Sequence, residues 1–155
     1  MASPGVPPRW QPLFDRLLLL KAAWPMRGFS WDGRFECIAS SFPAMHEPKA
    51  RAAAAEGLPN VWTSSTISKA PPRVQQLSET TGGIRTGQAL MVSDAPGGYF
   101  AYGLWWPWGD GVSISMRIGL VDVHPAREPF PSFLELFNVI VLTPPGDRGV
   151  TGVTQ

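Results

Sequence analysis

Residues 98–123 read GYFAYGLWWPWGDGVSISMRIGLVDV and contain the clearest structural pattern in this chain. From Val112 to Leu120, large apolar residues alternate with small or polar ones, which is the period of two expected of a strand with one buried face. The glycines around Asp110 are typical of a turn. The stretch therefore predicts a β-hairpin, with three of the seven tryptophans of the chain at its bend.

A turn centred on Gly109 predicts which residues of the hairpin share a face. One face then carries the large apolar residues of both strands, namely Phe100, Tyr102, Leu104, Trp106, Val112, Ile114, Met116 and Ile118. The opposite face, extended by a strand predicted at 86–93, carries a small-residue floor formed by Gly87, Ala89, Gly103, Ser113 and Ser115. This floor is bordered by the larger side chains of Tyr99, Met91 and Trp105, and Arg117 is the one charged residue on it. A register error of one residue would exchange the two faces.

Two interpretations of the small-residue floor remain open at this point. A helix that begins near Ser132 could lie close against it, because small side chains allow close approach. Alternatively, the floor is open and accepts a ligand or a side chain of a partner, with Arg117 meeting a carboxylate. Arg117 has no acidic neighbour in the predicted ladder, so this reading expects its charge to be solvated or completed by an external anion.

Trp108 lies between Pro107 and Gly109 at the bend, where few residues can cover it. An exposed tryptophan on a loop is often an interface anchor, since its large area binds at low entropic cost. The alternative is a lid folded over the end of the sheet. The candidate residues for binding a partner or ligand are Trp108, Trp105, Tyr99, Arg117, Ser113 and Ser115.

The rest of the chain predicts both helices and strands. Helices are expected at 12–24, ended by Pro25, and at 48–56, where an alanine-rich segment should be peripheral. A third helix is expected from a Ser132–Glu135 capping box to about Leu142, although 139–142 could be a strand. Further strands are expected at 29–39 around an Asp32-Gly33 turn, 61–68, 73–80 and 86–93. We therefore expect an α+β fold, with an antiparallel sheet of about five to six strands and N-terminal and C-terminal helices packed on it.

The 155 residues are enough for one domain, expected at 11–142. Proline-rich segments without periodicity predict a disordered N-terminal tail at 1–10 and a flexible C-terminal tail at 143–155.

The chain has nearly equal numbers of basic and acidic residues. It contains 13 Lys and Arg and 12 Asp and Glu, which gives a net charge of +1. Such a balance offers no field to attract a polyanion, so nucleic acid is not an expected partner.

Cys37 is the only cysteine, which excludes an internal disulfide and a thiolate-rich zinc site. The apolar run 17–20 is too short to cross a bilayer or to form the core of a signal peptide. These features lead us to expect a cytoplasmic protein that does not bind membranes.

The chemical motifs in the sequence are incomplete. His46-Glu47 is followed by Pro48 and by no second histidine, and 82–87 lacks the Lys and Ser/Thr of a phosphate loop. Cys37 is best explained as a buried apolar residue.

We assign no catalytic residue, cofactor or metal site, and expect a non-catalytic module that binds another protein, of an adaptor, immunity or chaperone-like kind. The alternative is a protein that binds a small anionic ligand, or a metal-independent enzyme, with the small-residue floor as its pocket; a carbohydrate-binding module ranks third.

Overall fold

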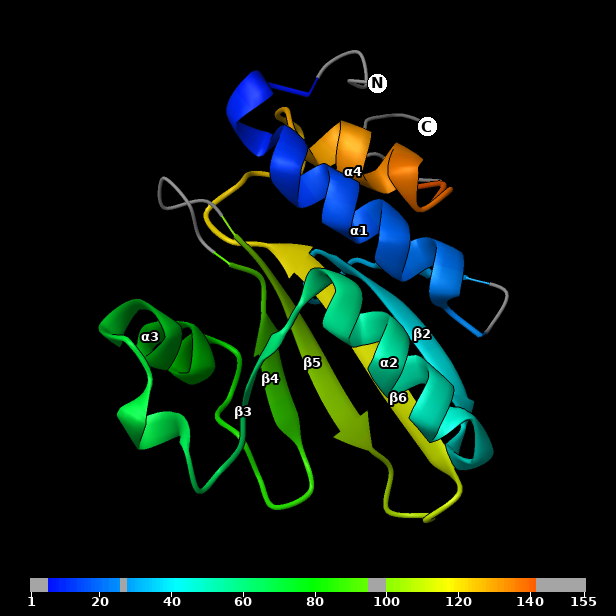
Figure 1. The fold of residues 1–155 in the computed structure, drawn as a ribbon, viewed down its shortest axis with the longest axis vertical. Coiled ribbons are helices and arrows are strands. Elements are labelled where there is room, and N and C mark those ends of the chain that lie inside the picture. The colour runs from blue at the N-terminus through cyan, green and yellow to red at the C-terminus, as the bar shows by residue number, and fades with distance from the viewer. Residues whose placement is uncertain (1–5, 26–27, 95–99, 142–155) are drawn as a thin grey trace, which may run out of the picture.

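The computed structural model describes residues 6–25, 28–94 and 100–141, which form one six-stranded antiparallel sheet and four α-helices (Figure 1). The strands are β1 (Ser30–Asp32), β2 (Cys37–Pro43), β3 (Asn60–Trp62), β4 (Ala89–Val92), β5 (Ala101–Pro107) and β6 (Ser113–Leu120). Their order across the sheet is β1-β2-β6-β5-β4-β3. The α+β class and the expected number of strands are confirmed. The strand expected at 61–68 is present only as the short edge strand β3.

The predicted hairpin is present as β5 and β6, but its register differs from the prediction by three residues. Tyr102 pairs with Gly119, whereas the prediction paired it with Met116. A shift by an odd number moves every β6 side chain to the opposite face relative to β5. The predicted division into a face of large residues and a face of small residues is therefore wrong.

The cause of the shift is the loop at 108–112, which is longer than the predicted turn. The Asp110 carboxylate accepts the backbone N–H groups of Val112 and Ser113 at 2.9 and 3.0 Å. Gly111 adopts a φ of 74°, a left-handed conformation that glycine adopts without a Cβ clash. The Trp108 N–H then donates to the Ser113 carbonyl at 2.8 Å and closes the loop.

The sheet separates two hydrophobic cores. The helices α1 (Gln11–Ala23), α2 (Glu47–Gly57) and α4 (Phe130–Leu136) cover one face (Figure 1). That face contributes Ala89, Met91, Ala101, Trp105, Ile114, Met116 and Ile118. On the opposite face, α3 (Pro72–Thr80) packs against Leu90, Val92, Tyr102 and Leu104.

The two N-terminal helices form the close-packed layer over the first core. α1 starts with Pro12 in its first turn and ends before Pro25, as predicted. α2 is also present where the sequence predicts it, but the expectation that it is peripheral is wrong. Ala50, Ala53 and Ala54 are fully buried. Their small side chains let the helix lie directly on α1 and the sheet, which a helix of larger residues could not do.

Two further predictions need correction. The segment 73–80 was expected to be a strand, but it forms α3, which starts at Pro72 and buries Val74 and Leu77 on one helical face. α4 starts at Phe130, so Ser132 is not an N-cap; its hydroxyl donates to the Glu128 carboxylate at 2.8 Å.

The C-terminal end of α4 comes earlier than predicted. Asn138 adopts a φ of 57°, and the N–H groups of Asn138 and Val139 donate to the carbonyls of Glu135 and Leu134. This is a Schellman C-cap, which stops the helix. The described residues 139–141 form neither a helix nor a strand, and Leu142 lies outside the described residues.

The segment predicted to be an N-terminal tail, 1–10, includes residues 6–10, which the structure describes. Pro8–Trp10 forms a 3₁₀ helix, and the side chains of Val6 and Trp10 are buried in the first core. Burial of a tryptophan and a valine favours order in this segment despite its prolines. Residues 1–5 and the expected C-terminal tail at 143–155 lie outside the described residues.

Candidate functional site

The predicted small-residue floor does not exist as one surface. Ala89 and Gly103 face the first core, where Leu58, just after α2, lies against Gly103. A Cβ on Gly103 would lie 2.5 Å from the Met116 Cε atom and 2.8 Å from the Leu58 Cδ1 atom, so both side-chain ends would have to shift to accept it. Gly87 lies in a turn with a φ of 89°, outside β4. The cover is therefore the segment after α2 rather than the helix near Ser132.

Trp105 was predicted to wall a binding surface, but it is fully buried. Its ring packs edge-on against Phe42 at 5.7 Å between centroids, and the Arg51 guanidinium of α2 lies 4.6 Å from its ring centroid. The Trp105 Nε1 atom makes no hydrogen bond with any described residue. Trp105 is thus a core residue that no partner can reach in this conformation.

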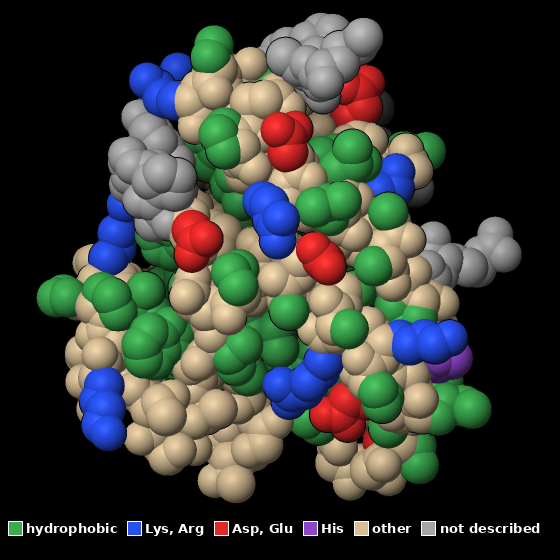
Figure 2. All heavy atoms as spheres, viewed as in Figure 1, with side chains coloured by type: hydrophobic (Ala, Val, Ile, Leu, Met, Phe, Trp, Pro, Cys, Tyr) green, Lys and Arg blue, Asp and Glu red, His purple; other side chains and the backbone are tan. Residues whose placement is uncertain are grey.

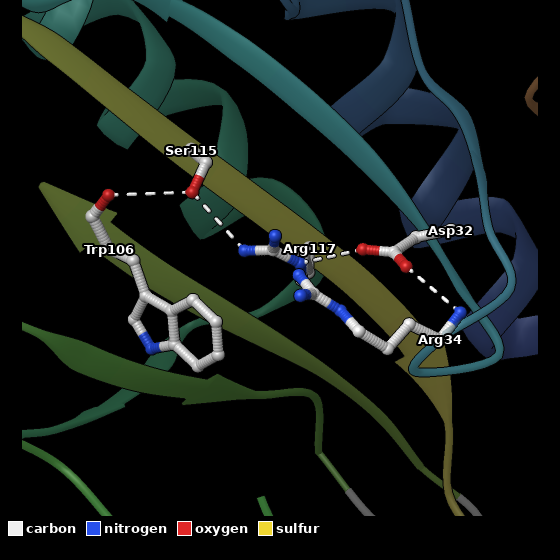
Figure 3. A network of polar contacts seen from close by, with 5 residues as sticks. All are labelled: Asp32, Arg34, Trp106, Ser115 and Arg117. Carbon is white, nitrogen blue, oxygen red and sulfur yellow. Dashed lines mark hydrogen bonds and ion pairs between the residues drawn. The ribbon is translucent and has the colours of Figure 1, made fainter. Parts of the chain in front are cut away.

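Arg117 lies on the opposite face and has an acidic partner, which the sequence prediction did not expect (Figure 3). Its Nε donates to the Asp32 carboxylate at 2.9 Å, and its Nη1 lies 3.3 Å from the Ser115 hydroxyl. The expectation that Arg117 has no acidic neighbour is therefore wrong. Asp32 comes from β1, which is brought beside Arg117 by the pairing of β1 with β2 and of β2 with β6. Asp32 also accepts the Arg34 N–H, the role that its turn predicts.

Aromatic rings extend this charged pair into an arginine–aromatic cluster, formed by Arg34, Phe35, Trp106 and Arg117. The Arg117 guanidinium lies 4.7 Å from the Trp106 ring centroid, and Phe35 contacts Trp106 edge-on at 5.9 Å. The Arg34 guanidinium lies 4.8 Å from the Phe35 ring. Such cation–π contacts hold guanidinium groups in place without neutralising them. The cluster is therefore a preorganised surface on which Arg34 remains exposed.

Trp108 lies at the hairpin tip, together with two other exposed apolar residues, Val112 and Met45. The exposed fractions are 50% for Trp108, 63% for Val112 and 80% for Met45. Met45 follows Ala44, whose N–H donates to the Val112 carbonyl at 2.7 Å, so the segment that carries Met45 lies at the same end of the sheet. We name these three residues the hairpin-tip patch.

The other predicted site residues are divided between these regions. Ser113 ends the loop below the hairpin-tip patch and is partly buried, and Ser115 is buried beside Arg117. Tyr99 lies outside the described residues. The prediction missed Met45, Phe35 and Asp32, which come from segments far from the hairpin in sequence. The only local signal was at Met45, where flanking prolines at 43 and 48 suggest an exposed segment.

Two buried groups have raised pKa values. Burial raises the pKa of the Cys37 thiol to about 12, and the nearby Asp32 carboxylate adds to this shift. Burial also raises the pKa of the Tyr102 phenol. Both groups are thus protonated at neutral pH, and Cys37 is a poor nucleophile because the thiolate is the reactive form.

Charge and metal-ligating groups are sparse in the described part of the chain. No three His, Cys, Asp or Glu side chains there lie close enough together to hold a metal ion. On the face shown in Figure 2, acidic and basic side chains are scattered, without a large area of one sign. Among residues 6–25, 28–94 and 100–141, no helix has the length and apolar character needed to cross a bilayer.

Comparison with known proteins supplies no relative: no family model, no curated protein and no solved structure matches this chain.

Proposed function

We propose that this chain is a non-catalytic binding module of the cytoplasm, and that the hairpin-tip patch inserts into an apolar pocket of a partner protein. The observation that carries the proposal is the exposure of Trp108, Val112 and Met45 at one end of the sheet. Large aromatic residues are the commonest energetic anchors of protein interfaces, because they bury much area with few rotatable bonds. The single cysteine, Cys37, is consistent with a reducing compartment.

The rigidity of the hairpin tip supports this role. The loop is held by two N–H groups donated to Asp110 and by the hydrogen bond from Trp108 to Ser113. Donation by Val112 also lowers the pKa of the Asp110 carboxyl, so the carboxylate stays ionised and keeps accepting. A loop that is already ordered loses little conformational entropy on binding.

The experiment begins with capture of a partner from extract of the native host by the full chain, followed by identification, expression and titration against purified variants. We expect Trp108→Ala to weaken the affinity by about 10- to 30-fold, as for a hot-spot residue. Leu18→Ala, which removes an apolar side chain of similar exposure, 53%, from α1, is the matched control and should change the affinity less than about twofold. Equal affinities of the wild type and Trp108→Ala would show that the partner binds elsewhere.

A further inference from the structure

A cavity of about 510 Å³ lies on the sheet face opposite α1 and α2, between α3 and the connection that follows β1. One wall is α3, with Arg73, Gln76 and Thr80. The other wall is Arg34 and Phe35, and the floor is formed by Tyr102 and Leu104, beside Leu77 of α3. The volume is within the range of roughly 300–1,000 Å³ that is usual for sites of small molecules. This cavity is separate from the hairpin-tip patch.

The charged side chains that line the cavity are two arginines and one aspartate, which sum to +1. Arg73 pairs with Asp122 at 3.2 Å and lies 4.8 Å from the Phe100 ring centroid. Across the cavity, Arg34 is held over Phe35, and its guanidinium forms no ion pair with any described acidic residue. The adjacent Arg117 is already neutralised by Asp32. Among the charged side chains that line the cavity, Arg34 is therefore the one without an ion pair to a described residue, and the Glu36 carboxylate lies close enough to Tyr102 to add to the raised pKa of its phenol.

Tyr102 places a hydroxyl group at the cavity. The residue as a whole is 9% exposed, but its hydroxyl is not one of the fully buried polar atoms without a partner, so we place it at the surface of the cavity. The ring lies over Gly119, where a Cβ would be 2.6 Å from the hydroxyl oxygen. Glycine at 119 thus makes room for the phenol at the cavity floor.

We propose that this cavity binds a small amphipathic molecule with a single oxyanion, either a carboxylate or a phosphate ester, attached to an apolar body. Arg34 and Arg73 bind the oxyanion from opposite walls, since guanidinium groups match its geometry. The apolar body lies on Leu77 and Leu104, and the Tyr102 hydroxyl donates to a ligand oxygen. The need for both parts distinguishes this site from a simple anion site.

The proposal is tested on the full chain by titration with four probes: benzoate, phenyl phosphate, inorganic phosphate and benzyl alcohol. We expect at least one of the first two to bind at least tenfold more tightly than both inorganic phosphate and benzyl alcohol, as measured by calorimetry and amide chemical shifts. Preference for phenyl phosphate over benzoate identifies a phosphate ester as the ligand class, and the reverse identifies a carboxylate. Equal binding of the phenyl compounds and inorganic phosphate overturns the proposal. The absence of binding by every probe up to 10 mM also overturns it, since a Kd of that value corresponds to a binding free energy of only about −2.7 kcal/mol.

Two variants assign the binding to the named residues. Arg34→Gln should weaken binding of the preferred probe at least fivefold, whereas Arg85→Gln, an equal charge change at an exposed arginine outside the cavity, should leave it within twofold. Tyr102→Phe should weaken binding two- to fivefold while leaving the melting temperature of the free protein unchanged or higher. A lower melting temperature for Tyr102→Phe would mean that the hydroxyl has a partner within the protein, and would contradict the assignment.

Discussion

Trp105 and Trp106 are neighbours in β5, yet they lie in different environments on opposite faces of the sheet. Trp105 is enclosed by Phe42, Arg51 and the helices of the first core. Trp106 is partly exposed and packs against Phe35 and Arg117. Both indoles contact a guanidinium, but only Trp105 is surrounded by close-packed apolar side chains.

The difference shows how one sheet supports two kinds of surface. The face under α1, α2 and α4 is filled by interlocking side chains, with small residues at the points of closest approach. The opposite face is covered only in part, by α3, and the remaining area carries Arg34, Phe35, Trp106 and Arg117 together with the cavity. Stability thus depends mainly on the first face, and binding groups are available on the second.

Replacing the two tryptophans should separate these roles most clearly. We expect Trp105→Ala to lower the free energy of unfolding by about 3–5 kcal/mol, since a cavity would remain in a close-packed core. Trp106→Ala should lower it by about half as much or less, because part of this indole already contacts water. Urea denaturation followed by circular dichroism measures both. Similar losses would mean that the second face is packed as tightly as the first.

The reactivity of the Cys37 thiol tests whether water reaches the interior of the second face, beneath the arginine–aromatic cluster. With its pKa raised to about 12, roughly one thiol in ten thousand is ionised at pH 8, compared with about one in ten at the ordinary value of 9.0. Alkylation by iodoacetamide should therefore be about a thousandfold slower in the folded protein than in urea. The rate in the folded protein should continue to rise with pH above 9, where the rate in urea levels off. Matching rates at pH 8 would show that water reaches the thiol.

The ion pair between Asp32 and Arg117 should contribute a moderate stabilisation. Asp32→Ala should cost about 1–3 kcal/mol, because it leaves a largely buried guanidinium without its carboxylate. Adding Arg117→Met should recover part of this loss, which a double-mutant cycle in urea can quantify. An additive cycle would indicate that the two side chains do not interact in solution.

The smallest effect on stability is expected at the hairpin-tip patch. Trp108→Ala should change the free energy of unfolding by less than about 0.5 kcal/mol, as for other surface substitutions. The control is Ile114→Ala in the buried part of the same hairpin, for which we expect a loss of about 2–5 kcal/mol. A loss above about 1 kcal/mol at Trp108 would indicate that its indole is a structural lid.

The candidate site could be predicted only in part. Trp108 was identified correctly as exposed, because a tryptophan between proline and glycine in a turn has few neighbours that could cover it. The surroundings of Arg117 could not be predicted, since Asp32 is 85 residues away and reaches it only through the pairing of β1, β2 and β6. Trp105 was misplaced because the register was wrong.

Local patterns in the sequence determined the elements whose causes are local. The prolines set the start and end of α1, the alternation in 112–120 predicted a strand, and the arrangement of these elements predicted the α+β class. Tertiary structure decided the rest. The carboxylate of Asp110 lengthened one loop and reversed the faces of a hairpin, and packing rather than composition buried the alanines of α2. The physical reason is that register, burial and ion pairs depend on contacts between distant segments, whose free energies no local pattern encodes.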